Sequence, residues 1–268
     1  QQALNRRVSP LILRRTKDQV ATDLPEKTEI LHRVTLSPKE LDLYESVRAL
    51  MDKRVREAIR SRGLSQSQII VLDALLKLRQ VCCHPSLVKT PAAAKVKSAA
   101  KFSFLIDELL PALVEDGRRI LLFSSFTSVL SLIEEELKSR GIGYLKLTGR
   151  TRHRAPLVKT FQEGETSVFL ISLKAGGTGL NLTAADTVIH YDPWWNPSAE
   201  NQATDRAHRI GQTKPVFVHK LICEGGIEER ILELQAHKAR LVEALLSEKA
   251  NKLRLDESTL SALLAPIG

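Results

Sequence analysis

Arg206 and Arg209 have the residue type and the spacing of a phosphate clamp. Asn196-Pro197 precedes them and predicts a helix start, with Asn as the cap and Pro in the first helical position, where its missing N–H costs nothing. From there, Gln202, Arg206 and Arg209 fall at i, i+4 and i+7, on one face of one helix. Two permanently charged guanidinium groups on one face can bind a phosphoryl group in transfer. Two arginines alone are more often part of a solvated helix face, so the hypothesis depends on neighbouring segments.

A glycine-rich segment, residues 172–182, follows an apolar run at 167–171 that predicts a buried strand. Glycines directly after a strand let the backbone approach a phosphate closely, although a tight turn alone would use them too. The segment is not a Walker A loop, because Lys174 precedes the glycines instead of following them. The groups suited to a track for DNA phosphates are the backbone of Gly176 and Gly177, the hydroxyls of Ser172 and Thr178, and Lys174.

Several segments together carry a resemblance to a known family. They are residues 13–17 with 24–27, 78–85, 120–127, 172–181 and 202–212. They resemble the second RecA-like lobe of SWI/SNF-type ATPases, the helicase-like motors that track along duplex DNA. The motif sequences are most similar to those of bacterial members. Residues 172–181 resemble motif V of that family, and residues 202–212 resemble motif VI. Ser125 and Leu147-Thr148-Gly149 depart from the family pattern, so no role is assigned to those positions.

The resemblance implies a role for individual residues. Arg206 and Arg209 would be arginine fingers on ATP, with Gln202, Gly177 and Gly179 supporting the ATP site. Trp195 resembles the family tryptophan beside the DNA groove, and the alternative is a packing role in the lobe. Arg150 and Arg152 belong to a basic run that adds positive charge for DNA.

The missing motifs are equally informative. The sequence contains no Gly-x-x-x-x-Gly-Lys-Ser/Thr and no Asp-Glu-x-His box. In the family these lie on the first lobe, so the chain is expected to be a C-terminal half without ATPase activity of its own. ATP and Mg²⁺ would be held mainly by the first RecA-like lobe of the same parent chain. The further partners expected are double-stranded DNA and a DNA-bound protein as cargo, with no membrane.

The composition agrees with a nucleic-acid partner. The chain has 268 residues, 40 Lys and Arg against 31 Asp and Glu, and a net charge of +9, which favours a polyanion. Its three cysteines suggest no disulfide framework. Cys82, Cys83 and His84 are adjacent, and three consecutive residues rarely close a tetrahedral metal site, so no metal is expected. No apolar run is long enough to span a membrane, and the expected location is the cytoplasm, at the nucleoid.

Short apolar strands must position these residues. The expected strands are residues 120–123, 144–147, 168–171, 187–191 and 216–221, which alternate with helical patterns. This alternation predicts an α/β fold, and the resemblance makes it RecA-like: a parallel sheet with helices on both faces, a small helical subdomain and a C-terminal helix. The expected division is a connecting segment at 1–36, the helical subdomain and a linker at 37–98, the RecA-like lobe at 99–224, and a brace helix with a tail at 225–268.

In the helical subdomain, Tyr44, Val47, Met51, Val55 and Ile59 recur at helical spacing, with an end expected at Gly63. Another face of this helix is basic. Its residues are Lys53, Arg54, Arg56, Arg60 and Arg62, and a solvated face and a DNA-facing role are equally consistent with them. A second apolar helical pattern covers residues 71–81.

Three other functions compete with the motor hypothesis. A non-enzymatic nucleic-acid-binding module would use the same basic surface without an arginine pair in register. A free-standing small-molecule enzyme would need its own phosphate cradle or a nucleophile and base, and no such set stands out. An RNA helicase fits the Trp-Asn-Pro box less well than a DNA translocase does. Sequence upstream of Gln1 with a Walker A loop would decide for the motor.

Overall fold

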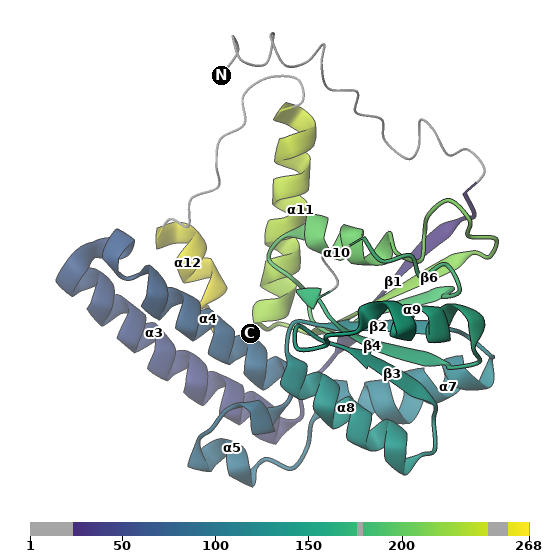
Figure 1. Cartoon of the computed structure of the whole chain (residues 1–268). Helices are drawn as coiled ribbons and strands as arrows, with labels where there is room; N and C mark the ends of the chain where they lie inside the picture. The colour runs from purple at the N-terminus through teal and green to yellow at the C-terminus, as the bar shows by residue number, and fades with distance from the viewer. Residues whose placement is uncertain (1–23, 176–178, 246–256, 268) are drawn as a thin grey trace.

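The protein is described by a computed structural model that covers residues 24–175, 179–245 and 257–267 (Figure 1). These residues form a six-stranded sheet, in the order β1-β6-β5-β2-β4-β3, in which every pair of neighbours is parallel. The strands are β1 Lys27–Val34, β2 Ile120–Ser124, β3 Tyr144–Leu147, β4 Val168–Ser172, β5 Thr187–His190 and β6 Val216–Cys223. The predicted parallel α/β sheet is therefore confirmed, with all five expected strands present.

Helices cover both faces of the sheet because successive strand residues point to opposite sides. Ile120 and Leu122 pack with α7 and α8, whereas Leu121 and Phe123 pack with α9 and α10. In Figure 1, α7 and α8 lie below the sheet, and α9 and α10 lie above it. The helices on the first face are α6 Ala100–Ser103, the π-helical stretch η3 Phe104–Leu109, α7 Leu110–Glu115 and α8 Thr127–Ser139; those on the second are α9 Arg154–Glu163 and α10 Pro197–Thr204.

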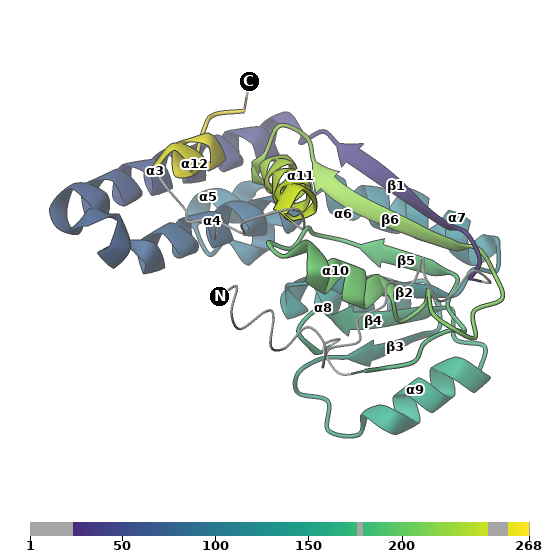
Figure 2. The ribbon, with the colours of Figure 1, turned by 90° about the horizontal axis from the view of Figure 1, so that it is seen from above.

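A helical subdomain extends from one side of the sheet (Figure 2). It contains α3 Pro38–Gln66, α4 Gln68–Cys83, the 3₁₀ turn η2 Pro85–Leu87, α5 Pro91–Lys95 and α12 Glu257–Leu263, and the base of α11 Ile227–Leu245 packs against it. Tyr44, Val47, Met51 and Val55 are buried in its core, as their spacing predicted. The expected end at Gly63 is confirmed: its φ of 75° and ψ of 166° are not helical, so the first helical run of α3 stops there and a short second run continues to Gln66.

Ser37 and Glu40 set the start of α3. The Glu40 carboxylate accepts from the Ser37 backbone N–H at 3.1 Å and so satisfies a donor that the helix leaves free. Among the described residues, no helix is both long enough and apolar enough to cross a membrane.

The edge strand β1 was not predicted. Residues 27–34 were expected to lie inside the connecting segment, but they pair with β6 from Lys27 opposite Val216 to Val34 opposite Cys223. Only alternate residues toward the end of β1 are partly covered, and Lys27, Thr28 and Glu29 are exposed. An edge strand needs no continuous apolar run, so its sequence carries little strand signal.

Two histidines connect β1 to β6. The rings of His32 and His219 are stacked at 5.2 Å, with Nε2 of His32 at 2.9 Å from Nδ1 of His219. Burial, the neighbouring ring of His32 and the charge of Arg118 lower the pKa of His219 to about 4. Burial also lowers the pKa of His32. Both rings are therefore neutral at neutral pH, as their contact requires.

We predict that acid weakens the fold through this pair. Histidines in the unfolded chain have a pKa of about 6.5, so they bind protons at a pH at which the folded rings stay neutral. Their contribution to the free energy of unfolding is complete above about pH 6.5 and is lost as the pH falls toward 4. The free energy of unfolding, measured by urea titration between about pH 7 and pH 5, should fall by up to about 1.4 kcal/mol per pH unit for each histidine.

The variant His219→Gln should flatten this dependence, and His153→Gln, which changes an exposed ring, should keep it. An equally steep pH dependence in His219→Gln and in the parent chain would contradict the assignment.

Candidate functional site

The carboxyl ends of the central strands meet at one edge of the sheet. Phe123 of β2 lies opposite His190 of β5 and Ile171 of β4, so the chain leaves all three strands at the same level. Parallel α/β sheets bind ligands beyond this edge. Lys174 is exposed just after β4, and Ser172, the last residue of β4, is buried. Gly176, Gly177 and Thr178 lie outside the described residues.

A cavity of about 160 Å³ opens at this edge. Lys174 from the motif V segment lines it together with Gln202 and Arg206 from the motif VI segment. Trp194 and the small residues Ala199 and Ala203 complete most of its wall. The tertiary structure thus brings together three predicted site residues that are up to 32 positions apart in the sequence.

The arginines do not lie on one helix, and that prediction was wrong. Asn196 does cap α10, since its Oδ1 accepts from the Ser198 N–H at 3.1 Å, and Pro197 is the first helical residue. The helix nevertheless ends at Thr204, so Gln202 lies on α10, whereas Arg206 and Arg209 lie on the turns that follow.

Gln212 holds the turns that follow α10. Its Nε2 donates to the carbonyls of Thr183, Ala185 and Ala207 at 3.1, 2.7 and 3.0 Å. Its Oε1 accepts from the N–H groups of Thr213 and Lys214, both at 2.9 Å. Thr183 and Ala185 lie before β5, so Gln212 ties the turn after α10 to that segment, while its other bonds satisfy backbone groups of the turn itself.

The charge on Arg206 is in an unfavourable setting. Only 5% of Arg206 is exposed, and Arg209 is half-buried nearby. Burial lowers the pKa of Arg206, the positive charge of Arg209 lowers it further, and Asp205 opposes these effects. Because a guanidinium stays protonated even so, an anion placed here would be stabilised by two positive charges in a region of low dielectric. This donor chemistry fits a phosphate group.

The basic run lies at the same edge of the sheet. Arg150 and Arg152 are exposed in the loop that follows β3, before α9 begins. At the start of α9, Arg154 donates to the carbonyl of Ala175 at 3.5 Å, which connects this loop to the motif V segment. Gly179, at the far end of that segment, is exposed and has open space around it. Arg150, Arg152 and Lys174 are therefore exposed basic side chains at this edge.

Sequence reasoning missed Arg79 and Asp192, which build the wall behind the cavity. The Arg79 guanidinium, 3% exposed, donates to Asp192 and to the carbonyl of Pro193, both at 2.8 Å. It also lies over the rings of Trp194 and Trp195, at 5.5 and 6.0 Å. A charged residue on the otherwise apolar face of residues 71–81 was the available signal.

Trp195 is partly buried against the core of the helical subdomain, under Arg79. This position agrees with the packing alternative, and it leaves part of the ring open to solvent. Its contact with DNA stays a prediction.

A second buried ion pair lies beside the cysteines. Ligand atoms of Cys82, Cys223 and Glu228 come within 4.8 Å of one another, an arrangement that adjacent positions in the sequence did not reveal. However, both Glu228 oxygens accept from Lys101 Nζ, at 2.6 and 2.7 Å. Burial raises the pKa of Cys82. A metal here would have to displace an ammonium group and deprotonate buried thiols, so the cluster fits a structural ion pair better than a metal site.

Comparison with known proteins identifies relatives of the whole chain. Residues 1–87 match the family described as SNF2-related domain, and residues 100–211 match the family described as Helicase conserved C-terminal domain. An uncharacterized ATP-dependent helicase of Mycoplasma pneumoniae is 41% identical over 251 residues, which are 92% of this chain and 23% of that protein. The chain thus spans about a quarter of the length of the curated relatives that it matches.

Two solved structures from Sulfolobus solfataricus share the fold at 32% identity. The SWI2/SNF2 ATPase core domain superposes with a TM-score of 0.71, over 98% of this chain and 54% of that one. The same ATPase core in complex with dsDNA superposes with a TM-score of 0.67, over 92% of this chain and 52% of that one. The sheet described above is therefore RecA-like, as the motifs predicted.

We predict that Gln212→Met loosens the arginine turn. Methionine has a similar length but forms none of the five hydrogen bonds, so buried carbonyls lose their donor, at a cost of about 1–3 kcal/mol for each group left unsatisfied. Hydrogen exchange followed by mass spectrometry should show faster exchange across residues 205–212. Gln202→Met, at an exposed position on α10, is the matched control. Unchanged exchange in Gln212→Met would show that the turn does not depend on this side chain.

Proposed function

Because this chain belongs to the SNF2 family of ATP-dependent helicases, we propose that it is the second motor lobe of a double-stranded DNA translocase. In this proposal the first RecA-like lobe holds ATP and Mg²⁺, and this lobe supplies positive charge to the nucleotide and a track for DNA phosphates. The observation that supports it most directly is the cavity that Lys174, Gln202 and Arg206 line together at the carboxyl edge of the sheet.

On the ATP side, Arg206 and Arg209 act as arginine fingers. Negative charge spreads over the phosphoryl oxygens during transfer, and preorganised guanidiniums stabilise that charge without having to reorient. Burial and the nearby positive charge of Arg209 lower the pKa of Arg206. An anion bound beside both guanidiniums would offset their mutual repulsion, which suits such a role. Gln202 couples the lobes, and Gly177 and Gly179 let the backbone approach the nucleotide. The lobe alone has no phosphate cradle, so we expect no ATP turnover from it.

On the DNA side, Lys174, Arg150 and Arg152 supply charge to the phosphate backbone. Ser172, Gly176 and Thr178 supply hydroxyl and backbone donors, and Trp195 lies against the groove. Contacts of this type position a protein on DNA without reading sequence, as translocation requires. The dsDNA complex of the Sulfolobus ATPase core supports this assignment.

The motor works by opening and closing of its two lobes. Closure would bring Arg206 and Arg209 to the nucleotide on the first lobe, and release after hydrolysis would let the lobes separate. If each lobe holds the DNA backbone in turn, the duplex advances without separation of its strands. The force would act on a DNA-bound protein as cargo, at the nucleoid.

The experiment that tests this function uses the two-lobe protein. Arg206→Ala and Arg209→Ala should each lower DNA-stimulated phosphate release by about 10³-fold, the usual value of an arginine finger, while duplex binding persists. Arg33→Ala, whose side chain is 54% exposed on the edge strand β1, is the control and should retain turnover. Full turnover in both site variants would remove the arginines from the catalytic role.

The DNA track predicts a specific dependence on salt. Affinity for duplex DNA should fall steeply as salt rises, with a slope of about 0.9 in log–log terms for each phosphate contact. Arg150→Ala with Arg152→Ala should lower that slope by up to about 2, as measured by fluorescence anisotropy across a salt series. Lys138→Ala, 60% exposed on α8 across the sheet, should leave the slope unchanged. Binding that does not respond to salt would argue against a phosphate track.

A further inference from the structure

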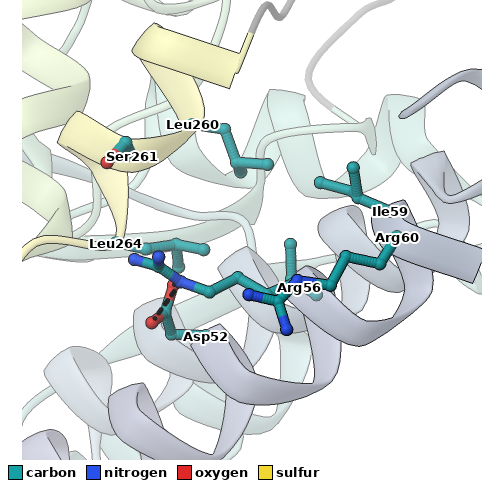
Figure 3. A pocket seen from close by; sticks show the side chains of 8 residues that line it. Asp52, Arg56, Ile59, Arg60, Leu260, Ser261 and Leu264 are labelled. Carbon is teal, nitrogen blue, oxygen red and sulfur yellow. Dashed lines mark hydrogen bonds and ion pairs between the residues drawn. The ribbon is translucent and has the colours of Figure 1, made fainter. Parts of the chain in front are cut away.

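A groove lies between α3 and α12, apart from the proposed ATP and DNA surfaces (Figure 3). Its volume is about 530 Å³. Leu260 on α12 and Leu264 just after it lie on one side, and the residues that line it from α3 include Asp52, Arg56, Ile59 and Arg60. None of these side chains has a part in the function proposed above.

The floor of the groove is apolar. Val55, Leu260 and Leu264 are buried, with 1%, 4% and 3% of their surface exposed, and Ile59 packs beside them partly open to solvent. Additional apolar side chains placed on this floor would be removed from water and so stabilised.

The groove is already formed in the isolated chain. Arg48 on α3 donates to the Leu264 carbonyl at 3.1 Å, and Arg230 on α11 donates to the Pro266 carbonyl at 2.7 Å. Glu45 accepts from the Ile267 N–H at 2.9 Å. These bonds anchor the end of α12 to two other helices, so a ligand would not have to organise the site.

The rim of the groove is basic. Arg56 has 63% of its side chain exposed and forms an ion pair with Asp52 one turn away, a surface contact that contributes little. The charged side chains that line the groove are Arg56, Arg60 and Asp52, so two positive charges stand against one negative charge. Exposed positive charge therefore borders an apolar floor.

We propose that this groove binds an acidic amphipathic peptide segment of a partner protein. Apolar side chains of the peptide would contact Ile59, Leu260 and Leu264, while its carboxylates would pair with Arg56 and Arg60. DNA is disfavoured, because phosphates gain nothing from an apolar floor. A second copy of this chain is disfavoured too, because each copy carries a net charge of +9 and would be repelled.

The test uses the full chain and a labelled helical peptide with leucines on one face and glutamates elsewhere. Fluorescence anisotropy at about 0.15 M salt, where distant charges are screened, measures its affinity. Arg56→Glu with Arg60→Glu should weaken binding at least about tenfold, and Ile59→Asp should weaken it similarly. Arg62→Glu reverses one charge on the same helix outside the groove and should leave the affinity within about twofold.

A scrambled peptide of the same composition separates shape from charge. It should bind at least about tenfold more weakly, because its leucines no longer share a face. Equal binding of the scrambled peptide would overturn the proposal, as would an effect of Arg62→Glu equal to that of the groove variants. Duplex DNA that binds the parent chain and loses affinity in Ile59→Asp would assign the groove to nucleic acid instead. Circular dichroism of each variant checks that the fold is intact.

Discussion

The buried ion pair between Arg79 and Asp192 is the interaction on which the arrangement of this lobe depends. Arg79 belongs to the helical subdomain, and Asp192 follows the end of β5, so one contact at 2.8 Å joins the two parts. Asp192 also accepts from the Ser124 hydroxyl at 2.6 Å and from the Ser125 N–H at 3.0 Å, at the end of β2. Loss of either charge would leave the other buried and unpaired, which typically costs about 3–5 kcal/mol.

The same region is supported from α11. The Glu200 carboxylate on α10 accepts from the Trp194 N–H at 2.5 Å and from Gln235 Nε2 at 3.0 Å. Gln235 donates as well to the Trp194 carbonyl. Burial raises the pKa of Glu200, so this carboxylate depends on these donors. The wall of the cavity is therefore held by α4 on one side and by α11 on the other, which makes it rigid behind the exposed Lys174 and Gln202.

The buried cations of the lobe differ in their surroundings. Arg79 and Lys101 are buried beside carboxylates at 2.8 and 2.6 Å, and those pairs are complete within the lobe. At Arg206, the positive charge of Arg209 affects the pKa more than the negative charge of Asp205 does. The two positive charges at Arg206 and Arg209 lie close together, whereas Arg79 and Lys101 each have a carboxylate partner.

The amino-acid sequence was sufficient to predict the strands of the central sheet. Residues 120–124 and 168–172 are short runs buried on both faces, so composition alone marks them as strands. It could not determine β1, whose half-exposed residues become a strand only through pairing with β6. The sequence pattern wrongly placed Arg206 and Arg209 on a helix, because local spacing does not reveal the hydrogen bonds from Gln212 to residues up to 29 positions away. Which buried charges pair with each other depends on the tertiary structure, since Arg79 and Asp192 are 113 positions apart in the sequence.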